Sequence, residues 1–232
     1  MPGDAIIEIK NLSAGYNKKF VFSDITLDIA ANQIIGLAGL NGQGKTTFIK
    51  TLLGLKKSQS GELVYHGNIK SPFSYLPEKF SPPLELSGLE YLHFVCDLEK
   101  QPCCTDHIVQ QAMTFQMTQD ILAKRMASYS KGMRQKIGVL ATFLTGSPII
   151  ILDEPMSGLD PLGRSQVKKM ILMAKNKGKT ILMTSHMLSD IQEICDKFML
   201  LHDKKLAFYG SPHDLMQQSA QDTLEQAFLQ MI

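Results

Sequence analysis

Residues 39–47 have the composition and spacing of a phosphate-binding loop. They read Gly39-Leu40-Asn41-Gly42-Gln43-Gly44-Lys45-Thr46-Thr47, which fits the pattern G-x-x-x-x-G-K-T. Glycines leave room for backbone N–H groups to surround phosphate oxygens. Lys45 is placed to reach the β- and γ-phosphates, and the Thr46 hydroxyl to bind a magnesium ion. The pattern predicts a nucleoside triphosphate site; the alternative is a glycine-rich turn that only joins two elements.

Three apolar runs predict the strands that position this chemistry. Residues 34–38 precede the glycine loop, residues 148–154 end in Asp153 and Glu154, and residues 180–186 end in His186. A helix beginning near residue 47 would add unpaired N–H donors and a partial positive charge. Runs this apolar are typical of parallel strands covered on both faces, whose carboxyl ends form the ligand site. We therefore expect Lys45, both carboxylates and His186 to face one crevice.

These residue types suit hydrolysis of the terminal phosphate. Asp153, at the end of an apolar strand, would anchor magnesium together with Thr46. Glu154 would orient or deprotonate the attacking water. His186 would hydrogen-bond the γ-phosphate; the alternative is a core histidine satisfied by backbone groups.

The remaining patterns predict an α/β chain with an inserted helical segment. Residues 6–9 and 21–29 read as strands of an antiparallel layer, with Tyr16 in the turn between them. The Tyr16 ring could stack on adenine, or it could be a turn tyrosine without a ligand. Helical periodicity from about residue 79 to 126, with Ser87 as a cap, predicts a lobe inserted into the α/β core. Residues 197–210 read as a hairpin followed by two short helices.

Composition narrows the protein class. The chain has 232 residues, enough for one large domain, and a net charge of +2, so no nucleic acid partner is expected. It contains no apolar run near the roughly 18 residues of a membrane span and begins without a signal-peptide pattern. The four cysteines lack metal-ligand spacing, which favours a reduced, cytoplasmic setting.

A second anion-binding loop is expected before the helix predicted to run to about residue 145. Ser130, Lys131, Gly132 and Met133 lie at its start, where N–H groups are unpaired. The alternative is an ordinary helix cap with basic surface residues. One nucleotide does not need two such loops from the same subunit, so this one could close over a nucleotide held by another copy.

Together these residues resemble the ATP-binding cassette family, the nucleotide-binding subunits of ABC transporters. Tyr16 falls where the family's adenine-stacking aromatic lies, and residues 39–46 match Walker A. Residues 130–133 match the signature loop, 149–154 Walker B and 157–160 the D-loop, which ends in Asp160. His186 matches the switch histidine.

The resemblance implies an α/β P-loop fold of the ABC type. Its mixed sheet core would carry an N-terminal antiparallel β layer and the inserted helical lobe. A single domain over residues 1–232 is expected, with a RecA-like core of about 1–78 and 136–232 and a lobe of about 79–135. The resemblance also implies a head-to-tail homodimer with two ATP molecules, each bound with Mg²⁺, between Walker A of one copy and the signature loop of the other.

Two departures from the family pattern matter, one in the signature loop, which reads Tyr129-Ser130-Lys131-Gly132-Met133, and one in the Q-loop. The signature is usually L-S-G-G-Q; here Lys131 replaces the first glycine and adds a positive charge. Glu78 replaces the usual Q-loop glutamine, which keeps an oxygen ligand for magnesium but removes an amide donor. Both departures resemble those of the ABC-2-type export ATPases.

The resemblance implies an integral-membrane permease as partner, which would place the chain on the cytoplasmic face of the membrane. Candidate residues for a groove that receives the permease are Phe80, Leu84, Leu86 and Leu89, which could instead pack the lobe's own core. The expected function is an ATPase subunit that powers export. Alternatives are an importer subunit, a soluble ABC ATPase acting on DNA or ribosomes, and a regulatory cassette that binds ATP without hydrolysing it.

Overall fold

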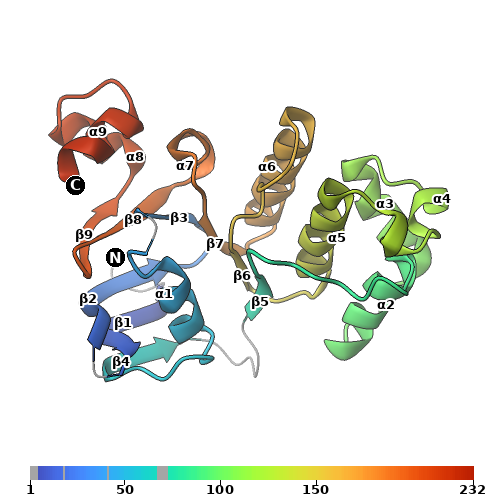
Figure 1. The fold of residues 1–232 in the computed structure, drawn as a ribbon, viewed down its shortest axis with the longest axis horizontal. Coiled ribbons are helices and arrows are strands. Elements are labelled where there is room, and N and C mark those ends of the chain that lie inside the picture. The colour runs from blue at the N-terminus through green and yellow to red at the C-terminus, as the bar shows by residue number, and fades with distance from the viewer. Residues whose placement is uncertain (1–4, 18, 41, 67–72) are drawn as a thin grey trace.

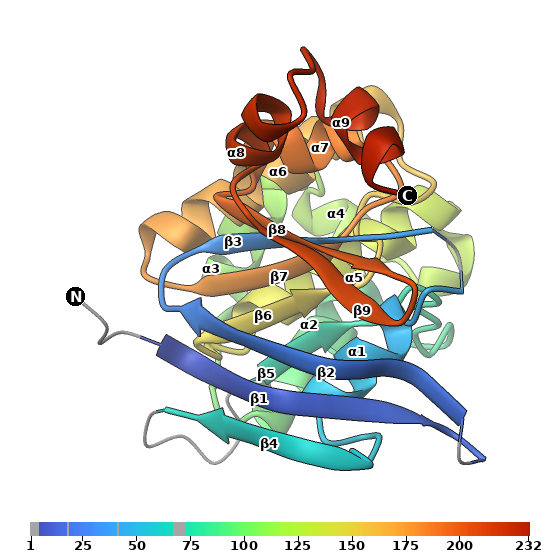
Figure 2. The same ribbon diagram turned by 90° about the vertical axis from the view of Figure 1, so that its left-hand side faces the viewer.

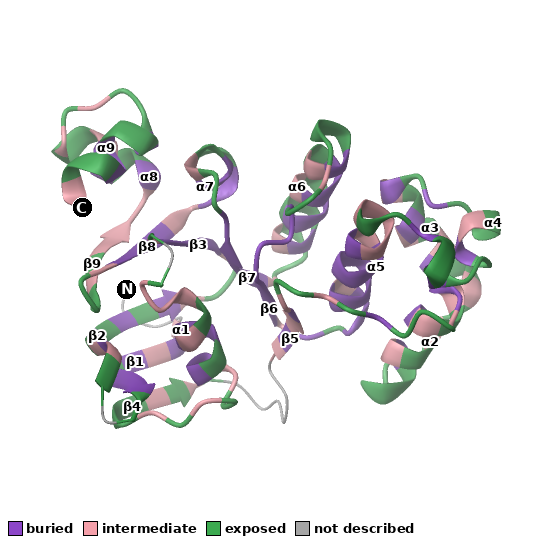
Figure 3. Cartoon of the chain, in the orientation of Figure 1, coloured by how far each residue is buried: buried purple, intermediate pink, exposed green. Residues whose placement is uncertain are grey.

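A six-stranded sheet forms the middle of the molecule. The computed structural model describes residues 5–17, 19–40, 42–66 and 73–232. The strand order is β5-β6-β7-β3-β8-β9, formed by Phe73–Leu76, Ile149–Leu152, Thr180–Thr184, Ile34–Ala38, Lys197–His202 and Lys205–Gly210. All neighbours pair in parallel except β8 and β9. Strands β3, β6 and β7 are buried along their whole length (Figure 3), as their apolar sequences predict.

A second, antiparallel sheet of order β2-β1-β4 lies beside the first (Figure 2). It comprises Ala5–Tyr16, Lys19–Ala30 and Ser60–Tyr65. Both N-terminal strands are longer than predicted, and Tyr16 is the last residue of β1 rather than a turn residue. Asn11 and Asp24 have φ of 48° and 55° where the register shifts. These bulges interrupt the alternation from which strand length was predicted.

The helix that follows the glycine loop, α1 (Lys45–Leu52), packs between the two sheets. Its Phe48 ring meets Phe22 of β2 edge-on, with ring centroids 5.6 Å apart. Ile35 and Leu37 of β3 belong to the same buried cluster. This apolar contact fixes the start of α1 relative to the end of β3.

The helical lobe occupies one end of the molecule, beyond β5 (Figure 1). It contains α2 (Gly88–Leu98), α3 (Thr105–Ala112), η1 (Met113–Phe115), α4 (Gln119–Leu122), η2 (Met126–Ser128) and the first part of α5 (Lys131–Leu144). Ser87 and Glu90 form a reciprocal capping box at the start of α2, so the predicted cap at Ser87 is present. Helix α5 contacts α2 in the lobe and β5, β6 and α6 in the core, so it joins the two.

The remaining helices are α6 (Pro161–Asn176), α7 (Leu188–Ile194), α8 (Pro212–Gln218) and α9 (Leu224–Met231). Gly178 follows α6 with a left-handed φ of 82°, the predicted helix end. The last two helices lie at the end of the molecule opposite the lobe (Figure 1). Within the described ranges, every helix is too short or too polar to cross a membrane.

Candidate nucleotide-binding and active site

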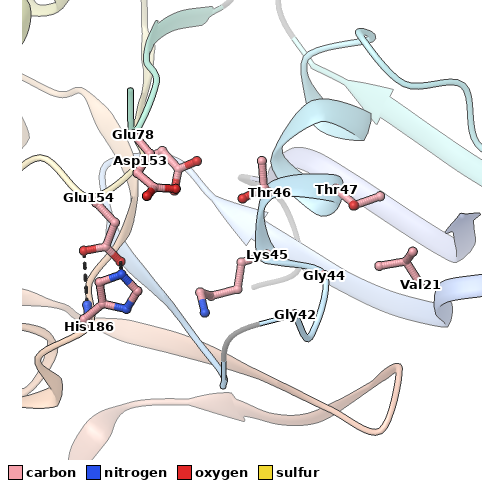
Figure 4. A pocket seen from close by; sticks show the side chains of 10 residues that line it. All are labelled: Val21, Gly42, Gly44, Lys45, Thr46, Thr47, Glu78, Asp153, Glu154 and His186. Carbon is pink, nitrogen blue, oxygen red and sulfur yellow. Dashed lines mark hydrogen bonds and ion pairs between the residues drawn. The ribbon is translucent and has the colours of Figure 1, made fainter. Parts of the chain in front are cut away.

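A cavity of about 480 Å³ opens at the carboxyl ends of β3, β5, β6 and β7. Residues that follow all four strands line it together with Val21 of β2 (Figure 4): Val21, Gly42, Gly44, Lys45, Thr46, Thr47, Glu78, Asp153, Glu154 and His186. The strand order sets β7 between β3 and β6, so these strand ends meet at one edge of the sheet. The structure thus brings the glycine loop, both carboxylates and His186 around one space.

The glycine loop holds its lysine in the lining of the cavity. Gly44 directly precedes α1 with a left-handed φ of 97°, and a Cβ there would lie 2.7 Å from Val21 Cγ1. The Lys45 Nζ donates to the carbonyl oxygens of Gly39 and Leu40, at 2.6 Å and 3.2 Å. Burial lowers the pKa of Lys45, and the nearby carboxylates oppose this effect. Asn41, predicted to contact nucleotide, lies outside the described residues.

Asp153 is buried and has one carboxylate oxygen without a partner. Its Oδ1 accepts a 2.7 Å hydrogen bond from Thr184 Oγ1. Its Oδ2 has no hydrogen-bond partner among the described residues. Burial raises the pKa of Asp153, while the bond from Thr184 lowers it. An orphaned buried oxygen of this kind is suited to a ligand that brings positive charge.

Glu154 is held in an unusual backbone conformation beside His186. Its φ is 54°, in the left-handed region, and its N–H donates to Thr184 Oγ1 at 2.8 Å. The Glu154 Oε2 accepts from the backbone N–H of His186 at 3.2 Å, and Oε1 lies 3.5 Å from His186 Nε2. Burial raises the pKa of Glu154, and the His186 ring opposes this shift. The His186 side chain is 57% exposed, so it is not a core histidine.

The residues present fit a magnesium-bound triphosphate. Magnesium is usually held in proteins by one or two carboxylates together with substrate phosphates, rather than by a cage of side chains. Within the described part of the chain, no group of three or more His, Cys, Asp or Glu residues could hold a metal ion. Thr46 and Asp153 line the same cavity, and exposed Glu78 lines it as well. This partial ligand set suits a metal that arrives with phosphate.

Tyr16, Ser130 and Asp160 lie outside this cavity. Tyr16 is half-exposed, and the Lys56 ammonium lies 4.4 Å from its ring centroid. Ser130 caps α5 by accepting from the Met133 N–H at 3.1 Å, and Asp160 caps α6 through Gly163.

Residues 131–132 and 158–159, predicted as parts of the signature loop and the D-loop, pack against each other within the chain. The Lys131 side chain lies along Gly158, where an added Cβ would meet its Cε at 3.3 Å and its Nζ at 3.4 Å. A Cβ on Gly132 would lie 3.5 Å from Leu159 Cδ2. The two loops therefore form one surface, separate from the cavity of the same chain.

Sequence reasoning missed three residues at this site. Val21 lines the cavity from β2, a strand that carries no polar signal. Thr184 contacts both acids, and buried Asp190 accepts a 2.9 Å hydrogen bond from Ser185, next to His186. The one available signal for Thr184 was a polar residue at the carboxyl end of the apolar stretch 181–183.

The family assignment follows from comparison with known proteins. The family model described as ABC transporter matches residues 22–157, more than half of the chain. This chain belongs to the ABC transporter family. A relative similar to this ABC chain is the ABC-type transporter ATP-binding protein EcsA of Bacillus subtilis, 29% identical over 92% of this chain and 90% of EcsA.

A solved structure supports the ABC fold directly. It is titled as an ATP binding subunit of an ABC transporter and superposes with a TM-score of 0.87 at 28% identity, covering 97% of this chain and 99% of that one. The predicted fold class, an ABC-type α/β fold with an N-terminal antiparallel layer, is confirmed. As a member of this family, the chain is an ATP-binding subunit of the ABC ATPase type.

Other ABC relatives carry different transport names. The lipopolysaccharide export system ATP-binding protein LptB of Haemophilus influenzae is 27% identical over 91% of this chain and 93% of its own length. The manganese transport system ATP-binding protein MntB of Bacillus subtilis is 28% identical over 87% of this chain and 85% of its own length. Because these identities are nearly equal, the ABC relatives indicate neither a substrate nor a direction of transport for this chain.

Proposed function

We propose that this ABC chain hydrolyses Mg-ATP in the 480 Å³ cavity and powers export through a separate membrane permease. One observation carries the catalytic part: Lys45, the orphaned Asp153 carboxylate and the Glu154–His186 pair surround the same cavity. The export direction is supported by Lys131 and Glu78, which resemble the ABC-2-type export ATPases. Import is the alternative direction, and MntB, named for manganese transport, is similar to this chain.

Each lining residue has a task in this proposal. Lys45 and the loop N–H groups bind the β- and γ-phosphates, and the first turn of α1 adds its partial positive charge. Thr46 and Asp153 hold magnesium, with Glu78 as a further oxygen ligand; the ion neutralises charge on the phosphates. Glu154 orients the attacking water and accepts its proton, because its carboxylate is buried and fixed by the His186 N–H. His186 then hydrogen-bonds the γ-phosphate.

A second copy of the chain completes the site. Ser130 and Gly132 lie at the N-terminus of α5, a 14-residue helix whose first N–H groups favour an anion. Since they lie outside the cavity of their own chain, they would contact ATP held by the partner copy. Lys131, which packs along Gly158, Met133, which follows Gly132 on α5, and Asp160, the cap of α6, would join this contact.

The permease is proposed to dock in a groove of about 550 Å³ between the lobe and the core. Strand β5, the segment after it, α2 and α5 line the groove, and Phe80 is part of the lining. Leu84 is 43% exposed and does not line the groove, whereas Leu86 and Leu89 are half-buried and pack against the main core. We therefore place docking at Phe80 and its neighbours, with the chain held at the cytoplasmic face by the permease.

The decisive experiment measures the mass in solution of Glu154→Gln with and without Mg-ATP. We expect an ATP-dependent change from monomer to dimer, because the variant binds ATP but does not hydrolyse it. Adding Lys45→Ala should abolish ATP binding and the dimer together. Adding Ser130→Arg should leave ATP binding intact and abolish only the dimer. A Glu154→Gln chain that binds Mg-ATP and stays monomeric would contradict closure by the isolated subunit.

A further inference from the structure

We propose that Thr184 is a positioning residue that sets both acidic groups of the ATPase site through its single hydroxyl. Thr184 is fully buried at the end of β7, between the strand that leads to the glycine loop and the strand that carries the acids. Its Oγ1 donates to Asp153 Oδ1 at 2.7 Å and accepts from the Glu154 N–H at 2.8 Å. The inference rests on the proposed ATPase function and adds a residue to it.

The Thr184 hydroxyl can donate its proton to only one of its two partners, Asp153. A backbone N–H can only donate, so the bond with Glu154 occupies a lone pair of the Thr184 oxygen. The hydroxyl proton is left for Asp153, whose ionised carboxylate can only accept. Both bonds have good length, and both lie in the protein interior, where such networks are strong.

For Asp153, this bond decides which oxygen remains free. Oδ1 is occupied by Thr184, while buried Oδ2 has no partner among the described residues. A carboxylate held in this way presents one fixed oxygen to a metal. Neighbouring residues commonly orient metal ligands by hydrogen bonds of this kind. Without the hydroxyl, the carboxylate could rotate, and neither oxygen would keep its direction.

For Glu154, the same oxygen stabilises a strained backbone. A left-handed φ is unfavourable for a glutamate unless the surrounding structure holds it. The bond to Thr184 fixes the Glu154 N–H, and the bond from the His186 N–H fixes its carboxylate. Loss of the first would let the peptide between Asp153 and Glu154 turn, which moves both side chains at once.

The test compares Thr184→Val with Thr184→Ser and with Thr180→Val. Valine keeps the shape of threonine without the hydroxyl, and serine restores the hydroxyl without the methyl group. Thr180 is a matched control because it is also buried on β7, at the other end, where its hydroxyl accepts from the Asn32 N–H at 2.9 Å. Thermal unfolding reports the stability lost with each hydroxyl.

The readouts are the Kd of a fluorescent ATP analogue with EDTA, its Kd with Mg²⁺, and kcat. The Mg²⁺ effect is the ratio of the Kd in EDTA to the Kd in Mg²⁺. In Thr184→Val we expect an unchanged Kd in EDTA and a Mg²⁺ effect smaller by about tenfold. We also expect kcat to be lower by about tenfold or more. Thr184→Ser should recover most of both losses. Thr180→Val should lower the unfolding temperature while leaving the Mg²⁺ effect and kcat unchanged.

Two results would overturn the proposal. One is a Thr184→Val chain with the wild-type Mg²⁺ effect and kcat. The other is Thr180→Val with the same losses as Thr184→Val, which would make them a general consequence of a weakened strand. Failure of the ATPase function itself is distinguishable, since the wild-type chain would then neither bind nor hydrolyse Mg-ATP.

Discussion

Glu154, which we propose activates the attacking water, shows how the requirements of such a carboxylate conflict with those of a stable fold. It is buried, its backbone is left-handed, and one of its oxygens has no hydrogen-bond partner among the described residues. Burial disfavours the charged form and raises its pKa, although the nearby His186 opposes that effect. The net direction means that ionised Glu154 costs folding free energy.

We therefore expect Glu154→Gln to stabilise the ligand-free chain near neutral pH. A carboxyl group whose pKa is raised on folding contributes stability below its unfolded pKa, and this contribution is lost as pH rises through the folded pKa. Glutamine does not titrate, so the variant should be more stable than wild type at pH 7–8 and equal to it towards acid pH. Each gain of about 1 kcal/mol would raise the unfolding temperature by roughly 2–4 °C.

Thermal unfolding at several pH values checks this expectation. Glu85→Gln removes an exposed carboxylate and serves as the control. A Glu154→Gln chain that is less stable than wild type at pH 8 would show that the bonds to Glu154 outweigh the cost of its burial.

At the scale of elements, ion pairs to the buried Asp190 join α6 to α7, the helix that follows His186. Arg164 and Lys168 on α6 both contact Asp190 on α7. Asp190 also accepts from Ser185 Oγ at 2.9 Å, and Ser185 Oγ accepts from the Met187 N–H at 3.1 Å. His186 lies between these two anchored residues, so its position depends on α6.

Asp190→Ala should therefore reduce both stability and turnover. The loss should be about 3 kcal/mol, the low end for a broken buried pair, because the two cations remain partly exposed. We expect kcat to fall while the Kd for ATP in EDTA stays near wild type, since the glycine loop is not touched. Urea unfolding and steady-state kinetics measure the two effects.

Glu193→Gln is the matched control for this ion pair. Glu193 also binds Lys168, but its side chain is 60% exposed, so the variant should lose less than about 1 kcal/mol and keep its turnover. Equal losses in both variants would contradict the assigned role of Asp190.

Features that depend on neighbouring residues in the sequence were predicted, and features that depend on long-range contacts were missed. The glycine loop, the Ser87 cap and the Gly178 helix end depend on residues within a few positions, and the structure shows each of these features. The convergence of strand ends was predictable because parallel strands share an edge. The contacts of Thr184 were not, because they require the register in which Leu152 pairs with Met183. No pattern along the chain encodes that register.

At the scale of the whole molecule, the groove between lobe and core is the surface on which we propose that the permease docks. Ser81→Arg would fill it without removing a packed side chain, because Ser81 is exposed and lines the groove. We expect the purified variant to keep its ATPase rate. The fraction of the chain that sediments with membranes from its native cells should fall several-fold.

Leu84→Arg provides the comparison, since Leu84 is exposed but does not line the groove. Loss of membrane association in Leu84→Arg alone would show that the permease docks on the surface around Leu84 and not in the groove. Normal association in both variants would place it elsewhere on the molecule.

The position of β3 within its sheet has a consequence for synthesis of the chain. Its hydrogen-bonded neighbours are β7 and β8, and the first of these begins about 140 residues after β3 ends. At roughly 5–20 residues per second, a ribosome needs about 7–30 s to cover that distance. During this time the antiparallel β1-β2-β4 sheet can form, but the fully apolar β3 has no partner strand. The strand that leads into the glycine loop therefore stays without its sheet neighbours until most of the protein has been made.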